Sequence, residues 1–248
     1  MHAVTAVFVH GVPETPSVWT PLVGNLERDD VALLQLPGFG CPLPDGFDPT
    51  MHRYADWLAE QLRAFDEVDL VVHDWGALLA LKVLADQPAN VRSWATDVGD
   101  LGADFRWHDT ARAWQTPGEG EALIDGMVGA SLTDRAALLE AVGVPEADAP
   151  AMATHLDRTM GEAILALYRS ATDIGNEWGP GIDRIRGRGL VIVSMQDRFR
   201  SHRRATRLAE RTRAEIVELP NAGHFWMLEE PVRTAQVLTE FWRRLARS

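Results

Sequence analysis

The sequence predicts an α/β fold in which a mostly parallel β-sheet has helices on both faces and carries an inserted helical cap. Short, β-branched apolar runs alternate with helical patterns over the first 100 residues and again after residue 187. The segment between these two parts has helical patterns only. Polar side chains follow several predicted strands, at the edge of the sheet where folds of this class place their chemistry.

The bulk composition excludes several classes of function. The chain has 248 residues, of which 46% are hydrophobic, enough for one large core. Its formal net charge of −12 argues against a nucleic-acid partner and against an anionic membrane surface. One cysteine, Cys41, allows no internal disulfide and fits a reducing, cytoplasmic location. No signal peptide and no membrane span are predicted, and the oligomeric state stays open between monomer and homodimer.

The first 100 residues hold four predicted strands separated by helices. Each strand is short and apolar, and each helix repeats apolar residues at helical spacing. Ser17 is predicted to cap the first helix, and Pro37-Gly38 ends the second strand. The predicted strands are residues 3–11, 31–40, 68–74 and 91–100, and the predicted helices are residues 17–26, 51–65 and 77–85.

Residues 101–186 are predicted to form the helical cap. Ala-, Leu- and Met-rich helical patterns cover residues 103–115, 120–132, 134–142 and 155–171, and this insertion is too long for an ordinary loop. The chain then returns to the sheet with strands at 189–197 and 214–224 and helices at 203–213 and 231–246. The predicted core therefore comprises residues 1–100 and 187–248.

The stretch "LVVHDWGALLALKVLAD", residues 70–86, contains the most informative turn. A buried strand ends at Val72 and a buried helix begins near Ala77. A sharp turn between a strand and a helix pushes its central residue outward, and Gly76 leaves room for it. In the Gly-x-Ser-x-Gly elbow a nucleophilic serine has this position. Here Asp74 has it.

Three polar residues follow strands in the order Asp74, Asp197, His224. Together with "VFVHGVPE" and "QLPGFG", this order resembles the α/β-hydrolase superfamily, whose triad runs nucleophile, acid, histidine. The resemblance covers nearly the whole chain and implies the α/β-hydrolase fold. It also implies an oxyanion hole made by the backbone N–H groups of Val12 and Trp75. The chain starts directly at the strand before "HGVP", so a smaller sheet is expected.

An aspartate at the elbow, within "HDWG", looks like the branch that holds epoxide hydrolases and haloalkane dehalogenases. A carboxylate can displace a leaving group at an sp³ carbon and form an alkyl ester. The resemblance implies that His224, oriented by Asp197, then activates the water that hydrolyses this ester. Asp97 and Asp100 remain alternatives for the acid, because some relatives place it one strand earlier.

Residues of the predicted cap help to distinguish between an epoxide and a halogenated compound as the substrate. Epoxide hydrolases protonate the opening oxygen with cap tyrosines, and Tyr168 lies where that branch has its second one. No tyrosine occupies the first position, so a second donor is expected among His108, Thr110 and Trp107. In a haloalkane dehalogenase, Trp75 would instead bind the halide, but Val12 stands where an Asn donor is common. Fluoroacetate dehalogenases bind the substrate carboxylate with arginines on the elbow helix, which here has Trp75, Leu78 and Leu79 in those places.

The sequence therefore predicts an epoxide hydrolase that needs no cofactor or metal and acts on a small apolar molecule. Asp74, Asp197, His224 and Tyr168 are its expected catalytic residues. Trp75, Trp107 and His108 are expected to contact the substrate. The alternative is a haloalkane-type dehalogenase with the same nucleophile. A third alternative, from a different class, is a lid-bearing binding protein that has lost turnover.

Overall fold

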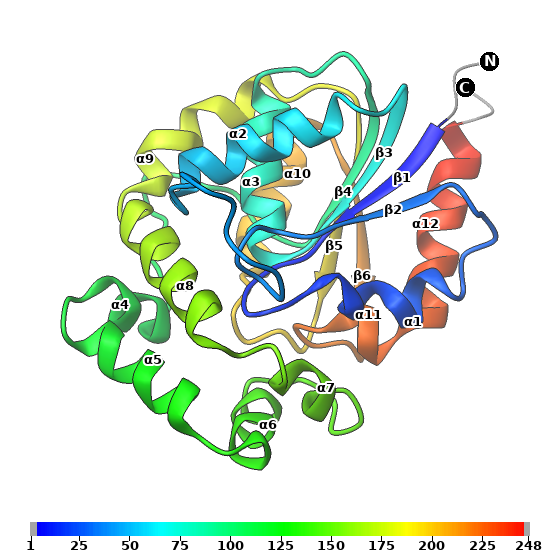
Figure 1. Cartoon of the computed structure of the whole chain (residues 1–248). Helices are drawn as coiled ribbons and strands as arrows, with labels where there is room; N and C mark the ends of the chain where they lie inside the picture. The colour runs from blue at the N-terminus through cyan, green and yellow to red at the C-terminus, as the bar shows by residue number, and fades with distance from the viewer. Residues whose placement is uncertain (1–3, 246–248) are drawn as a thin grey trace.

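The computed structural model describes residues 4–245, which contain one six-stranded parallel sheet with the strand order β2-β1-β3-β4-β5-β6 (Figure 1). The central strands β1, β3 and β5 are mostly buried apolar residues, as a sheet covered on both faces requires. The strands are β1 Val4–Val9, β2 Val31–Leu34, β3 Glu67–Val72, β4 Val91–Thr96, β5 Arg188–Ser194 and β6 Glu215–Leu219. The predicted parallel α/β sheet is confirmed, and its strands are shorter than expected.

The register aligns the carboxyl ends of the strands at one edge. Val9 of β1 pairs with Val72 of β3, which in turn pairs with Thr96 of β4. Ser194, the last residue of β5, pairs with the last residue of β6. The polar residues that follow these strands therefore meet at one edge of the sheet, although they are far apart in the sequence.

The helices cover both faces of the sheet. Figure 1 shows α1, α11 and α12 on one side and α2, α3 and α10 on the other. The helices are α1 Thr20–Val23, α2 Met51–Leu62, α3 Asp74–Ala85, α10 His202–Thr212, α11 Trp226–Glu229 and α12 Pro231–Leu245, with a 3-10 helix η1 at Pro16–Trp19. Ser17 lies inside η1, and Thr15 occupies the N-cap position, so the predicted cap was wrong by two residues.

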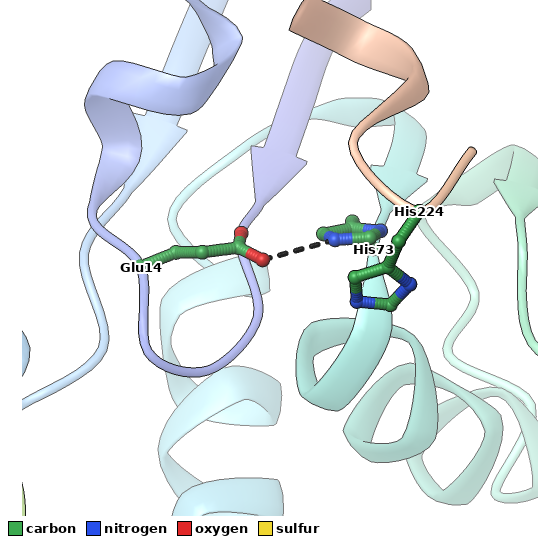
Figure 2. Close-up of side chains that lie close together, drawn as sticks. All are labelled: Glu14, His73 and His224. Carbon is green, nitrogen blue, oxygen red and sulfur yellow. Dashed lines mark ion pairs between the residues drawn. The ribbon is translucent and has the colours of Figure 1, made fainter. Parts of the chain in front are cut away.

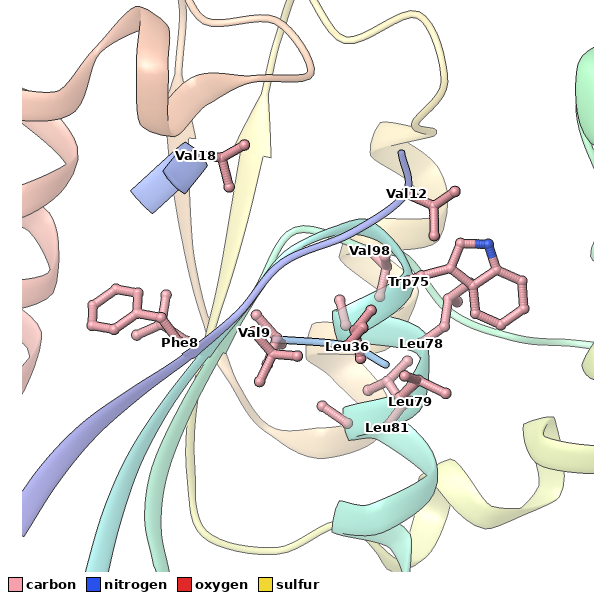
Figure 3. Packing of buried hydrophobic residues seen from close by; sticks show 14 of the residues in the cluster. Phe8, Val9, Val12, Val18, Leu36, Trp75, Leu78, Leu79, Leu81 and Val98 are labelled. Atoms are coloured by element: carbon pink, nitrogen blue, oxygen red, sulfur yellow. The ribbon is translucent and has the colours of Figure 1, made fainter. Parts of the chain in front are cut away.

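Helix α3 is almost wholly buried, and this burial fixes the strand-to-helix turn before it. Leu79 and Leu81 of α3 lie beside Val9 and Leu36 in the hydrophobic core (Figure 3). Ten of its twelve residues are buried, which explains the continuous apolar run in the sequence. The start of α3 is therefore held firmly against the end of β1.

No strand occurs among residues 97–187, all of which the structure describes. The helices from this segment named α4 to α8 extend beyond the layers of the sheet (Figure 1). They are α4 Asp109–Gln115, α5 Glu119–Gly129, α6 Leu132–Ala141, α7 Ala149–Ala153 and α8 Arg158–Ser170, followed by α9 Ile174–Trp178 and a 3-10 helix η2 at Gly179–Arg184. The helix expected over 103–115 begins only at Asp109, because His108 is its N-cap. The division into core and cap stays a prediction.

None of the helices in the described residues is long and apolar enough to cross a membrane.

Candidate active site

The turn at Asp74 has the strained geometry of a nucleophile elbow. Asp74 has a φ of 48°, which is uncommon for a residue with a side chain. A Cβ on Gly76 would lie 2.6 Å from the carbonyl oxygens of Val9 and His10, and one on Gly11 would lie 2.3 Å from the Cβ of Asp74. Both glycines let the chain approach the elbow closely. The predicted role of "HDWG" as a sharp, crowded turn fits this geometry.

Asp74, Asp197 and His224 lie together at the carboxyl edge of the sheet. His224 Nδ1 is 2.8 Å from Oδ2 of Asp197, and His224 Nε2 is 3.9 Å from Oδ2 of Asp74. The backbone N–H of Val12 donates to the other oxygen of Asp74, Oδ1, at 3.1 Å. The two oxygens of Asp74 thus have different partners: Oδ1 accepts from a backbone N–H, whereas Oδ2 accepts from Arg200 at 2.8 Å and lies on the side of the imidazole.

Trp75 is the second residue of α3, where backbone N–H groups have no partner within the helix. No hydrogen bond of this N–H to another described group is present. Its place in the oxyanion hole beside Val12 stays a prediction.

The charges around Asp74 and Asp197 keep both carboxylates ionised. Burial by itself raises the pKa of Asp74, but the charges of Arg200 and His224 outweigh it and lower that pKa below its usual range. Burial also opposes ionisation of Asp197, and the hydrogen bond from His224 reverses the effect, so its pKa is lowered too. Both groups therefore carry negative charge at neutral pH.

Asp97, the alternative acid, belongs to a different network under the elbow. It contacts the Nδ1 of His73, accepts from the indole N–H of Trp226 at 2.8 Å and accepts from the backbone N–H of Asp74 at 3.2 Å. On its other side, His73 Nε2 lies 2.9 Å from Glu14 Oε1 (Figure 2). Asp97 therefore supports the elbow and does not bond to His224. Asp100 forms ion pairs with two arginines of α10 instead, Arg207 and Arg211.

His73 is charged and fully buried. Burial lowers the pKa of an imidazole, but the two carboxylates of Asp97 and Glu14 outweigh this effect and raise the pKa of His73 well above its usual value. Glu14, His73 and His224 are the group of potential metal ligands that the described residues bring within 4.8 Å of one another (Figure 2). Glu14, Asp97 and Asp197 already pair with these imidazoles, so the contacts describe a charge network and no open coordination site.

A cavity of about 280 Å³ lies over Asp74. More than half of its wall is apolar or aromatic, and its polar members include several arginines as well as Asp74 and His224. Tyr168, from the carboxyl-terminal half of α8, lines the same cavity as Asp74. Burial and the charge of Asp74 raise the pKa of Tyr168 well above its usual value, so the phenol is neutral and keeps its proton. The apolar wall consists of Val12, Pro13, Leu78, Val98, Phe105, Trp107, Trp114, Val142, Phe199 and Phe225.

His108 also lines the cavity, beside Phe199. Its Nδ1 accepts the backbone N–H of Ala111 at 3.3 Å as the N-cap of α4. In a neutral imidazole whose Nδ1 accepts, the proton is on Nε2. Burial lowers the pKa of His108, so this neutral form prevails at pH 7. His108 can therefore present an Nε2–H donor.

The two indoles expected at the site are placed differently. Trp107 lines the cavity with its ring, but its N–H donates to the carbonyl of Ala171 at 2.8 Å, so it is not the second proton donor considered in the sequence. Trp75 is fully buried and does not line the cavity. It stacks on Trp107 with ring centroids 5.4 Å apart and meets Tyr168 edge-on. Its N–H lies beside the Tyr168 hydroxyl without a regular hydrogen bond.

Sequence reasoning missed Arg200. Its Nη2 lies 2.8 Å from Oδ2 of Asp74, and its Nε lies 3.8 Å from Oδ2 of Asp197. The available signal was its position three residues after the predicted acid, in the same loop. Glu14 was also missed as a functional neighbour, although it stands directly after "HGVP".

Comparison with known proteins agrees with this architecture. The family described as Alpha/beta hydrolase family matches residues 6–237. No curated protein sequence matches the chain. Among solved structures, the chain is similar to the haloalkane dehalogenase DbeA from Bradyrhizobium elkani USDA94, with a TM-score of 0.79, 21% identity and coverage of 99% of this chain and 92% of that one.

It is also similar to 2-hydroxy-6-oxo-6-phenylhexa-2,4-dienoate hydrolase from Rhodococcus sp. strain RHA1, with a TM-score of 0.76, 20% identity and coverage of 96% and 90% of the two chains. A third similar structure is E-2-(acetamidomethylene)succinate hydrolase, with a TM-score of 0.74, 19% identity and coverage of 98% and 92%. At these identities the structures support the fold alone. The family match extends over nearly the whole chain, and the protein therefore belongs to the alpha/beta hydrolase family.

Proposed function

We propose that the protein is an epoxide hydrolase that opens its substrate through an alkyl ester on Asp74. The observation that carries this proposal is that the two oxygens of Asp74 have different surroundings. Oδ1 accepts from the backbone N–H of Val12, while Oδ2 lies on the side of His224 and accepts from Arg200, which has to move away before Oδ2 attacks. A carboxylate held in this way has one oxygen to attack and another already in a site for negative charge.

In the first step, Oδ2 of Asp74 attacks an epoxide carbon and the carbon–oxygen bond of the ring breaks. The electron pair of that bond remains on the epoxide oxygen, which accepts a proton from the Tyr168 hydroxyl. In the second step, His224 Nε2 takes a proton from water, and the hydroxide attacks Cγ of Asp74. Charge collects on Oδ1 beside Val12 and Trp75. The bond between Cγ and Oδ2 then breaks, and the leaving alkoxide takes the proton that remains on the oxygen added from water, which gives a diol and the Asp74 carboxylate. The proton on His224 returns to the phenolate of Tyr168.

The donors in the cavity favour an epoxide over a halide. An epoxide leaves as an alkoxide, which needs a proton, and a neutral phenol or imidazole supplies one. Tyr168 keeps its proton at pH 7, and His108 presents an Nε2–H, so both fit this need. We further propose that residues 101–186 form a cap and that its aromatic wall holds the apolar part of a small substrate.

The second candidate function is a haloalkane-type dehalogenase. Trp75 favours it, since its buried indole N–H has no regular acceptor among residues 4–245 and a halide can accept such a donor. The similar structure named haloalkane dehalogenase points the same way. Against it, the N–H of Trp107 already bonds to Ala171, and Trp75 lies behind the wall of the cavity.

Trapping the ester tests the proposal. His224→Gln protein is incubated with styrene oxide and, separately, with 1-bromobutane, and the intact protein is weighed. An epoxide adds its full mass, whereas a haloalkane adds its mass less that of the hydrogen halide. A stable adduct from the epoxide, located on Asp74 and absent in an Asp74→Asn, His224→Gln double variant, supports the proposal. An adduct from the bromide alone replaces it with the dehalogenase, and no adduct across a wider panel of both classes favours the binding protein.

A further inference from the structure

Arg200 contacts the oxygen of Asp74 that would attack the substrate. Its Nη2 is 2.8 Å from Oδ2, whereas Oδ1 is taken by the N–H of Val12. The side chain is partly buried, with 22% of its surface exposed. Its Nε has no hydrogen-bond partner among the described residues. Arg200 therefore covers the nucleophile while part of its own donor set is unused.

An arginine in this position opposes the first step of the reaction. A carboxylate oxygen that accepts a charged hydrogen bond is a weaker nucleophile, and the guanidinium also occupies space on the side of attack. Moving a partly buried guanidinium away from its carboxylate leaves an unpaired charge, which is strongly unfavourable. The movement of Arg200 away from Asp74 costs less free energy if the incoming substrate supplies another anion for Arg200 to pair with.

The wall of the cavity supports an anionic substrate independently. Four arginines and two aspartates line it, in a chain with a formal net charge of −12. Asp74 is one of these aspartates, and Asp100 is already paired with Arg207 and Arg211. A positively charged hollow in a negatively charged protein attracts anions selectively. The four arginines are Arg106, Arg198, Arg200 and Arg204.

Two of these arginines have no ion-pair partner within residues 4–245. Arg198 donates to the carbonyl of Ala141 and lies over the ring of Phe199, and Arg106 donates to the carbonyls of Ala103 and Phe105. Carbonyl oxygens satisfy the donors without cancelling the positive charge. The hollow around Asp74 therefore has an excess of cationic groups beyond the pair that Arg200 forms.

We propose that the substrate carries a carboxylate next to its electrophilic carbon and that Arg200 binds this carboxylate. This inference rests on the proposed function of Asp74 and adds the substrate class. The planar guanidinium fits a carboxylate with two parallel hydrogen bonds. Without substrate, Arg200 pairs with Asp74 and keeps the nucleophile covered. With substrate, it turns to the substrate carboxylate and uncovers Oδ2.

Pairing of Arg200 with a substrate carboxylate is also favourable in the second step of the reaction. When Asp74 becomes an ester, it loses its negative charge, and Arg200 keeps only the longer ion pair between its Nε and Asp197, at 3.8 Å. A substrate carboxylate remains negative through both steps and keeps Arg200 paired until the product leaves. A neutral substrate supplies no such partner.

The test compares matched acids and amides in the wild-type protein, Arg200→Gln and Arg203→Gln. Arg203 is an exposed arginine of α10, outside the cavity, and its removal controls for the loss of one positive charge. The reactive pair is 3-phenyloxirane-2-carboxylate and its carboxamide, followed by kcat/KM. The unreactive series is benzoate, phenylacetate and 3-phenylpropanoate with their amides, followed by calorimetric titration.

We expect the wild-type protein and Arg203→Gln to prefer the acids by about 10²-fold in kcat/KM and in affinity. Arg200→Gln should lose this preference, so that its kcat/KM values and affinities for each acid and its amide become nearly equal. If acids and amides bind and react equally in the wild-type protein, the inference is wrong although the epoxide hydrolase proposal stands. If Arg200→Gln abolishes turnover of both epoxides equally, Arg200 acts on the leaving oxygen and the inference is also wrong. If the unreactive acids bind through Arg200 and no epoxide reacts, the anion site stands and the proposed function fails.

Discussion

The Nδ1 of His224 lies 2.8 Å from Oδ2 of Asp197, and no such bond joins His224 to Asp97 in the described residues. The two aspartates follow neighbouring strands, β5 and β4, and both are buried. Each holds one imidazole, Asp197 that of His224 and Asp97 that of His73. Under the proposed function, Asp197 serves the reaction and Asp97 supports the elbow, so the two should respond differently to the same substitution.

Asp197→Asn is expected to leave the unfolding midpoint nearly unchanged and to lower turnover by roughly 10²–10⁴, because an amide holds the imidazole but does not stabilise the imidazolium. Asp97→Asn is expected to cost about 1.5–3 kcal/mol of stability, because His73 loses one of its two charged partners and keeps only Glu14. Urea unfolding and steady-state kinetics on both variants measure these effects. A stable, inactive Asp97→Asn beside an active Asp197→Asn would assign the acid to β4.

Tyr168→Phe is expected to slow formation of the ester from an epoxide by roughly 10–10³, because the alkoxide loses its proton donor. Hydrolysis of the ester should change little. Trp75→Phe, which removes an N–H outside the cavity wall, should have the smaller effect on epoxides. Single-turnover mass spectrometry separates the two steps. A full rate in Tyr168→Phe together with a large loss in Trp75→Phe would point to a halide as the leaving group.

His73→Gln is expected to lose most stability at mildly acid pH. The pKa of His73 is raised in the folded protein, so its contribution is complete below about pH 6.5, the value in the unfolded chain. Above that pH the contribution declines by about 1.4 kcal/mol per pH unit until the folded pKa is reached. Urea unfolding of the wild-type protein and the variant at pH 5.5 and pH 8.5 measures the difference. An equal difference at both values would mean that folding does not shift the pKa of His73, and a larger difference at pH 8.5 would mean that folding lowers it.

Gly76→Ala is expected to destabilise the protein by roughly 2 kcal/mol or more and to disturb the elbow, because the new Cβ would meet two backbone carbonyls at 2.6 Å. Gly126→Ala in α5 is the matched control, since a Cβ there meets nothing within 4 Å. This control should be neutral or stabilising by about 0.5–1 kcal/mol. Thermal unfolding of both variants gives the comparison. Equal midpoints would show that the elbow relaxes around a methyl group.

The sequence alone determined the parallel α/β fold and the order of its elements. Strand and helix periods are local properties, and apolar runs such as Leu70–Val72 leave little choice between them. It also indicated that Asp74, Asp197 and His224 follow strands, and parallel strands bring such residues to one edge. The first and last residues of each element were less certain. The start of α4 at Asp109 depends on an N-cap by His108, which the hydrophobic pattern of the sequence did not reveal.

Only the tertiary structure decided which partner each side chain takes. Asp97 and Asp197 both follow strands, and the conformation of the loop after each strand decides which imidazole each one meets. Arg200 was invisible as a site residue, because nothing local directs its side chain across the edge of the sheet to Asp74. The positions of Trp75 and Trp107 likewise depend on packing between segments distant in sequence. This packing leaves Trp75 behind the cavity wall and bonds the indole N–H of Trp107 to the carbonyl of Ala171. Periodicity specifies which face of an element is buried, and the long-range fit of side chains specifies what that face touches.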